Sequence, residues 1–154
     1  MVWRLLKYVF AAAIAAIFVF LAILLLIPPE RPPVSFTDVD TRGWMPGEPV
    51  GIEMQAPDTL HRHRLRIIVR CDSRFMPDTL PLAVTLSVGG KVISNDTLNT
   101  GVGTATSPSH NAFEISLPYL EGVVFPRRDT FSVSVSHLSS AEVKGITAIG
   151  VSLE

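Results

Sequence analysis

The chain has a single cysteine, Cys71, among 154 residues, so no disulfide can form within it. We expect its thiol to pack as a small apolar group in a strand, and the alternative is a bridge to a second chain. Catalytic sequence patterns are also missing. No Gly-x-Ser-x-Gly segment marks a hydrolase nucleophile, and residues 101–103 lack the further glycine and the helix of a phosphate-binding loop. We therefore expect that the protein is not an enzyme and uses no cofactor.

The chain also lacks a large excess of either positive or negative charge. Beyond residue 27 the chain has eleven Lys and Arg against fourteen Asp and Glu, which gives no reason to expect nucleic acid as a partner. Aromatic residues are few in this part, which disfavours a pocket for a glycan or small molecule lined by aromatic rings. They are Trp44, Tyr119, Phe36, Phe75, Phe113, Phe125 and Phe131.

The one long hydrophobic run is residues 9–27, which contain no charge, glycine or proline. As a helix this run would rise about 28 Å, close to the roughly 30 Å hydrocarbon core of a bilayer. Arg4 and Lys7 lie just before it, whereas the residues just after it carry no net charge. This asymmetry predicts a single-pass membrane protein with residues 1–8 in the cytoplasm. The rest of the chain would lie in the periplasm or otherwise outside the inner membrane.

A cleaved signal peptide is the alternative for this segment. Signal sequences have an apolar core of roughly 7–15 residues, followed by a cleavage site with small residues. The run here is longer, and the alanines between residues 11 and 16 lie in its middle, while large Leu and Ile residues occupy its end. We therefore expect an uncleaved transmembrane helix that acts as a signal-anchor.

Residues 28–33 contain four prolines and predict a stiff, extended spacer. From residue 34 apolar and polar residues alternate, which is typical of strands buried on one face. The clearest example is Phe131, Val133 and Val135, which alternate with serines. The segments with this pattern are residues 34–39, 50–54, 64–70, 80–88, 91–98, 112–117, 131–136 and 149–153.

Turn signals separate these segments. Gly89 and Gly90 lie between two of them and are typical of a two-residue hairpin, because both positions of that turn need a positive φ. Residues 100–111 are rich in Gly, Ser and Thr, and we expect a polar, flexible loop there. About eight strands and no further helix predict an all-β fold, an antiparallel β-sandwich over residues 34–154.

Four arginines, Arg62, Arg64, Arg66 and Arg70, recur with the period of a strand. They would line one face, interrupted only by Ile68. One interpretation is the solvated outer face of a sheet. The other is a binding site for an acidic envelope protein or an anionic glycan, because guanidinium groups bind carboxylates bidentately and enter interfaces readily. We take these four arginines as the candidate partner-binding site.

His61 and His63 have the one spacing in the chain that is similar to that of a metal site. In a strand both imidazoles would share a face, but a metal site needs at least one more ligand. Asp58, His110 and His137 are available, yet nothing in the sequence brings them close. We therefore expect two surface histidines near the start of a strand and no metal site.

Five landmarks are spread over residues 44–154. Trp44 precedes a strand, residues 65–70 form an apolar strand that ends in arginine, and residues 96–98 (DTL) lie in the second strand of the hairpin. Residues 131–138 form a late strand, and residues 143–151 (VKGITAIGV) form the ending. Together these segments resemble the gliding-motility lipoprotein family of Bacteroidetes known as GldH. The most specific match is the ending, which resembles the family's terminal Gly-Ile-x-x-Val-Gly motif.

This resemblance implies a noncatalytic component of the cell envelope, linked to gliding motility or its associated secretion machinery. The chain departs from the family in two places. Family members begin with a lipoprotein signal and a lipidated cysteine, whereas we expect a spanning helix here. In residues 100–111 the family tends to have an aromatic Gly-Trp segment, and this chain has Gly, Ser and Thr.

The sequence leaves three functional hypotheses. The first is a membrane-anchored, extracytoplasmic module that acts by protein–protein interaction in a cell-envelope assembly. The second is a β-sandwich that binds a glycan or small molecule, which a concave pocket lined by aromatic residues would favour. The third is a hydrolase, which converging acids or a Ser–His pair would favour.

Overall fold

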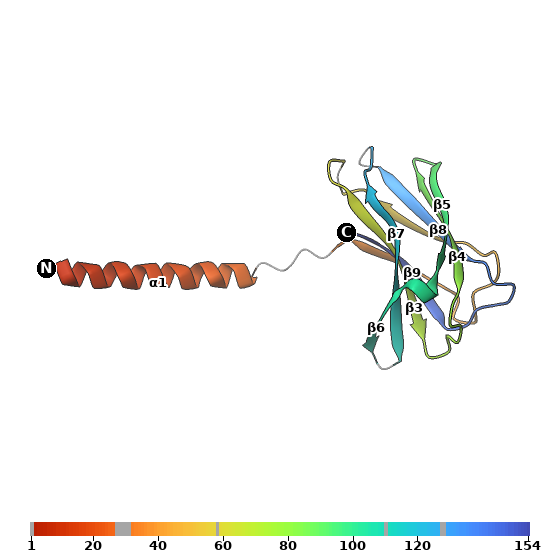
Figure 1. The fold of residues 1–154 in the computed structure, drawn as a ribbon, viewed down its shortest axis with the longest axis horizontal. Coiled ribbons are helices and arrows are strands. Elements are labelled where there is room, and N and C mark those ends of the chain that lie inside the picture. Colours follow the sequence, from red (N-terminus) through yellow and green to blue (C-terminus); the bar gives the residue numbers. More distant parts are fainter. Residues whose placement is uncertain (1, 27–31, 58, 110, 127–128) are drawn as a thin grey trace. The chain divides into compact units, whose positions relative to one another are not determined.

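A computed structural model of the chain describes residues 2–26, 32–57, 59–109, 111–126 and 129–154. Residues 27–31, which include the end of the apolar run and the start of the expected spacer, lie outside the described residues. The chain forms two compact units, Met1–Arg31 and Pro32–Glu154 (Figure 1). The first unit contains the long helix, and the second contains the strands.

Helix α1, Val2–Leu26, contains residues 9–26 of the apolar run and begins ahead of it. Alanine and leucine favour a helix, and no glycine or proline interrupts this one. Its part from Lys7 to Leu26 is the one helix among the described residues that is long and apolar enough to cross a membrane, and none of that part is buried. Length and composition fit both a membrane anchor and a signal sequence.

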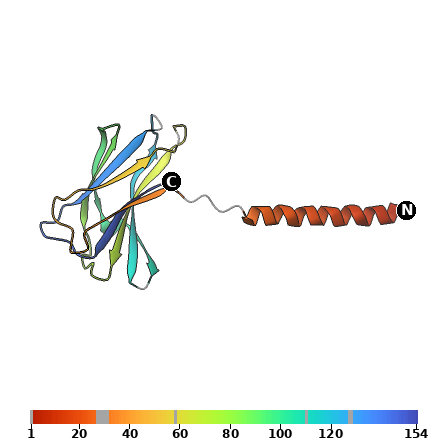
Figure 2. The same ribbon diagram turned by 180° about the vertical axis from the view of Figure 1, so that it is seen from behind.

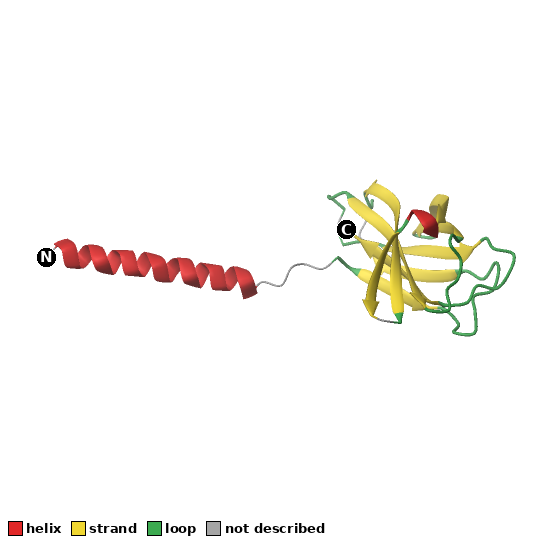
Figure 3. Cartoon of the chain, turned by 60° about the horizontal axis from the view of Figure 1, so that its bottom comes forward, coloured by secondary structure: helices red, strands yellow, loops and turns green. Residues whose placement is uncertain are grey.

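The described residues of the second unit form nine strands in two antiparallel sheets, which make a β-sandwich (Figure 3). The fold class predicted from the sequence is confirmed. The strands are β1 Val34–Asp38, β2 Val50–Gln55, β3 His63–Asp72, β4 Pro81–Val88, β5 Lys91–Asn99, β6 Thr104–Ser109, β7 Ala112–Val123, β8 Thr130–His137 and β9 Ile146–Leu153. A short 3-10 helix, η1 Thr100–Val102, lies between β5 and β6.

The order of the strands makes β3 the centre of the larger sheet. The five-stranded sheet has the order β1-β9-β3-β7-β6, and the four-stranded sheet has the order β2-β8-β4-β5. Strand β1 runs beside β9, as Figure 2 shows from behind. Where β1 and β2 meet across the sandwich, the hydroxyl of Thr37 donates to the carbonyl of Gly51 at 2.9 Å.

Alternation along the strands places one face of each sheet in the core. Phe131, Val133 and Val135 of β8 are fully buried, and the serines between them are half-buried. Ile67 and Val69 of β3 are equally buried in the facing sheet. Each large apolar side chain removed from water contributes roughly 1.5–3 kcal/mol, so this inner layer is the main source of stability.

The hairpin between β4 and β5 follows from its two glycines. Gly89 and Gly90 have φ angles of 57° and 79°, the left-handed values that a two-residue hairpin turn requires. Lys91 pairs directly with Val88 across this turn. The hairpin predicted from the sequence is therefore confirmed.

The prediction of a flexible loop over residues 100–111 is wrong. Helix η1 begins at Thr100, and β6 pairs with β7 at the edge of the five-stranded sheet, with Thr104 opposite Ser116. The segment shows no apolar alternation, because the side chains from Thr104 to Ser107 are exposed. The strand forms because β7 offers backbone hydrogen-bond partners, which an edge strand can accept without burying a face.

The two ends of the sandwich differ. At one end the amide of Leu153 donates to the carbonyl of Pro33 at 3.1 Å, and the backbones of Glu154 and Arg64 exchange hydrogen bonds of 2.9 and 2.6 Å. We call this the linker end, because residues 32–33 lead into the sandwich there. The opposite end carries the connections 39–49, 73–80 and 138–145, and we call it the loop end (Figure 2).

Candidate functional site

The candidate arginines lie on or next to β3. The side chains of β3 alternate, with one set buried between the sheets and the other on the outer surface. Arg62 precedes the strand. The outward-facing residues are Arg64, Arg66, Ile68 and Arg70. We call the surface formed by Arg64, Arg66 and Arg70 the arginine face. Because β3 is central, β9 borders this face on one side and β7 on the other.

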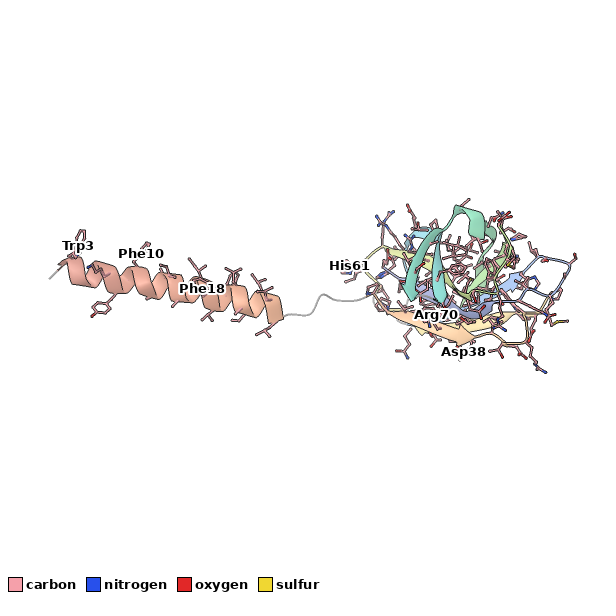
Figure 4. The ribbon with its side chains drawn as sticks, turned by 90° about the horizontal axis from the view of Figure 1, so that it is seen from below. Trp3, Phe10, Phe18, Asp38, His61 and Arg70 are labelled. Carbon is pink, nitrogen blue, oxygen red and sulfur yellow. The ribbon has the colours of Figure 1, made fainter. Side chains whose placement is uncertain are left out.

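Side chains from two other strands of the same sheet hold Arg70, which Figure 4 labels. Its Nη2 and Nε donate to Oε1 of Glu114 in β7 at 2.6 and 2.9 Å. Its guanidinium carbon lies 4.2 Å from the ring centre of Phe36 in β1. Phe36 can lie there because Gly150 has no side chain, since a Cβ at that position would be 2.5 Å from the ring. The charge of Arg70 is therefore matched within the chain, and its stem covers the sheet.

A hydrogen bond orients the side chain of Arg66, but no carboxylate neutralises its charge. Its Nε donates to the hydroxyl of Ser116 at 2.9 Å, and its terminal nitrogens make no hydrogen bond to any described residue. The register places Pro118 of β7 and Ser152 of β9 opposite Arg66. Strand β7 therefore supplies a carboxylate to Arg70 and none to Arg66.

Arg62 and Arg64 are exposed, and within the described ranges neither guanidinium forms an ion pair. Arg64 lies at the linker end, where Glu154 pairs with its backbone. Alternate residues of a strand are about 6.6–6.8 Å apart, so Arg64 and Arg66 present neighbouring guanidinium groups on one rigid surface. The structure thus divides the four predicted residues. Arg70 is used within the fold, whereas Arg66, Arg64 and Arg62 retain donors for another molecule.

The two closely spaced histidines do not face the same way. His61 precedes β3 and is exposed, whereas His63 is 9% exposed and its ring centre lies 6.0 Å from that of Phe125. The prediction of two surface histidines is wrong for His63, because the inward-facing set of β3 begins at this residue. In the part of the chain that the structure describes, no group of three or more His, Cys, Asp or Glu could hold a metal ion, and Asp58 and His110 lie outside that part.

His137 and Cys71 are internal groups. Nε2 of His137 lies 3.0 Å from the carbonyl oxygen of Trp44, and the two rings meet edge to face with centres 5.0 Å apart. Cys71 is fully buried in β3, as predicted, and burial raises the pKa of its thiol to about 12. A thiol with so high a pKa is unreactive at neutral pH, which disfavours a bridge to a second chain.

A groove of about 580 Å³ lies at the loop end, between the connections 73–80 and 138–145. Its described lining residues include no aromatic ring, so it differs from the pocket expected of a glycan-binding module. The groove was not predicted from the sequence, because loops far apart in the sequence give no shared pattern.

Comparison of the chain with protein-family models and with curated proteins finds no match. The site is therefore interpreted from its own geometry. The arginine face offers charged donors on the surface of a sheet, and the groove offers a concave, partly apolar surface. Both arrangements suit the recognition of another molecule.

Proposed function

We propose that the protein is a membrane-anchored, extracytoplasmic interaction module of a cell-envelope assembly. In this proposal α1 spans the inner membrane, with Arg4 and Lys7 on the cytoplasmic side and the sandwich in the periplasm. The module acts without catalysis. The resemblance to the GldH family supports a role in gliding motility or its associated secretion machinery.

The observation that carries this proposal is the unmatched pair Arg64 and Arg66. Arg70 of the same strand has its carboxylate from Glu114 at 2.6 Å, but β7 offers Arg66 only a serine and a proline. The central strand fixes the backbone positions of both arginines, so binding has to order only their side chains. An acidic surface of another envelope protein fits this face, and an anionic glycan is the other ligand with the same charge.

The glycan or small-molecule module remains the second hypothesis, and the aromatic residues argue against it. Trp44, Phe125 and Phe131 are at most 1% exposed, so they offer no ring to a sugar. A hydrolase has less support still, because Cys71 and His137 are enclosed in the core. Recognition by charge therefore has the best support among the three.

The anchor can be tested by topology. A reporter that is active only outside the cytoplasm, fused at Glu154, should be active, because the positive residues Arg4 and Lys7 precede the apolar run. Carbonate extraction of membranes should leave the full-length chain in the pellet. Recovery of a mature chain that starts near Pro28 would instead identify α1 as a signal peptide.

The arginine face can be tested by a double substitution, Arg64→Ser with Arg66→Ser. We expect the free energy of unfolding to change by less than about 1 kcal/mol, because largely solvated charges contribute little to stability. Recovery of partners from solubilised native membranes should fall sharply, and added salt should weaken the same recovery for the wild type. Mass spectrometry of the recovered material, with and without glycosidase treatment, separates an acidic protein from a glycan.

A matched control removes two positive charges elsewhere. Arg42 at the loop end has a side chain that is 88% exposed, and Lys91 lies exposed at the start of β5. The double variant Arg42→Ser with Lys91→Ser should retain its partners. Normal recovery by the folded Arg64→Ser, Arg66→Ser variant would reject the arginine face as the contact.

A further inference from the structure

The groove at the loop end has one wall held by side-chain hydrogen bonds. In the connection 73–80, Nη2 and Nε of Arg74 donate to Oδ2 of Asp72 at 2.6 and 3.0 Å. Nη1 of Arg74 donates to the carbonyl of Thr41 at 3.2 Å. At the other end of this connection the amide of Leu80 donates to the hydroxyl of Thr100 at 2.8 Å. The wall is therefore tied to two neighbouring loops.

The second wall, in the connection 138–145, is held by the backbone. The amide of Leu138 donates to the carbonyl of Pro81 at 2.9 Å, and the amide of Asp72 donates to the carbonyl of Gly145 at 2.8 Å. Gly145 lies so close to Phe75 that any Cβ would overlap the Phe75 backbone. The two walls are thus fixed to each other. A groove that exists before binding avoids the cost of ordering its walls.

The lining combines apolar and polar groups. Leu80 and Val143 are only 2% and 5% exposed, so the apolar surface open to a ligand comes from Met76, which is 83% exposed, rather than from these two residues. A methionine side chain is unbranched and polarizable, so it adapts to apolar ligands of different shape. Ser139 and Ser140 add hydroxyl groups beside this surface. The groove therefore suits a ligand with an apolar group and hydrogen-bonding groups.

The charges around the groove leave one cation for the ligand. Arg74 is already paired with Asp72. Glu142 extends over Gly43, where its carboxylate fills the space that a Cβ would need. Lys144 also lines the groove, and it forms no ion pair with any residue in the described ranges. A carboxylate on the ligand would complement Lys144.

We propose that this groove binds an extended peptide segment of a partner protein, with an apolar side chain against Met76 and a carboxylate at Lys144. The volume of about 580 Å³ lies in the range of roughly 300–1,000 Å³ typical of ligand sites, which suits a few residues of peptide. A sugar is a poorer fit, because the described lining has no aromatic ring for its apolar face. This site lies at the loop end, apart from Arg64 at the linker end.

The four methionines of the chain, Met1, Met45, Met54 and Met76, offer a direct test. The full chain, labelled with ¹³C-methyl methionine and held in nanodiscs, is titrated with a short blocked peptide of alternating Leu and Glu. The Met76 methyl resonance should shift and saturate. Met45, in another loop, and the core residue Met54 should not move. The matching Leu–Lys peptide should bind about tenfold more weakly, which corresponds to about 1.4 kcal/mol.

Two substitutions link the result to Lys144. Lys144→Ser should weaken binding of the Leu–Glu peptide about threefold, the size expected for one partly exposed ion pair. Lys91→Ser, the control, should leave it unchanged. The proposal is overturned if the Leu–Glu peptide leaves Met76 unmoved, if Met45 shifts as much as Met76, or if the two peptides bind equally.

The groove and the arginine face are tested separately. The Arg64→Ser, Arg66→Ser variant should bind the Leu–Glu peptide at Met76 with unchanged affinity, because it leaves the loop end intact. A loss of native partners in that variant, with binding at Met76 retained, supports two independent sites. A loss of peptide binding in the folded variant would place the peptide on the arginine face and reject the groove.

Discussion

Replacing Val135 with Asp is expected to lower the free energy of unfolding of the sandwich by more than about 4 kcal/mol. Val135 is fully buried in β8, between Val84 of β4 and Val50 of β2. A carboxylate there would lose its water and gain no partner, because its cross-strand neighbours are valines. Denaturant unfolding of residues 32–154 measures the effect. Trp44, which is 1% exposed, is the only tryptophan of that fragment and reports unfolding by fluorescence.

Ser134→Asp is the matched control, one residue away on the outer surface of the same strand. Ser134 is half-buried and lies opposite Gly51 and Thr85, so an added carboxylate keeps contact with water. The free energy of unfolding should fall by less than about 1 kcal/mol. Equal losses at the two positions would mean that β8 is not buried on one face only.

The local pattern that places Val135 in the core also explains why the fold class could be predicted. In β8 each of the three buried apolar residues is followed by a serine, and strand geometry alone converts this alternation into an inner and an outer face. The hairpin turn could be predicted for the same reason, because its positive φ angles depend only on the adjacent residues Gly89 and Gly90. Features that depend on neighbouring residues in the chain were therefore accessible from the sequence.

Strand β6 escaped prediction because its cause lies elsewhere in the chain. Its residues from Thr104 to Ser107 are exposed and have no buried face, and β7 provides the backbone partners. His63 was misjudged for a related reason. Its polar side chain suggests exposure, but strand alternation continues through it and places it beside Phe125.

The candidate site was predictable only in part. The spacing of the arginines correctly placed Arg64, Arg66 and Arg70 on the outer surface of a strand. Their different roles depend on residues far away in the sequence. Glu114, which binds Arg70, is 44 residues from it, and the contact with Phe36 requires β1 to join the same sheet. No local pattern encodes which arginine receives a carboxylate.

Replacing Gly145 with Ala is expected to lower the free energy of unfolding by more than about 3 kcal/mol, for two reasons. Its φ angle of 84° lies in the left-handed region, which an alanine adopts at a cost of roughly 1–2 kcal/mol. Its Cβ would also overlap backbone atoms of Arg74 and Phe75, and no change of rotamer relieves a clash with backbone. The same fluorescence measurement on residues 32–154 tests this loss.

Gly47→Ala separates the two contributions, because Gly47 has a similar positive φ angle in open space. Its φ angle is 73°, and no atom lies within 4 Å of the position that a Cβ would occupy. This variant should therefore lose only the conformational part, about 1–2 kcal/mol. The difference between the two variants then measures the close approach of the connections 73–80 and 138–145. If both lose the same amount, these connections are not pressed together at Gly145, and the groove between them lacks the fixed walls on which peptide binding depends.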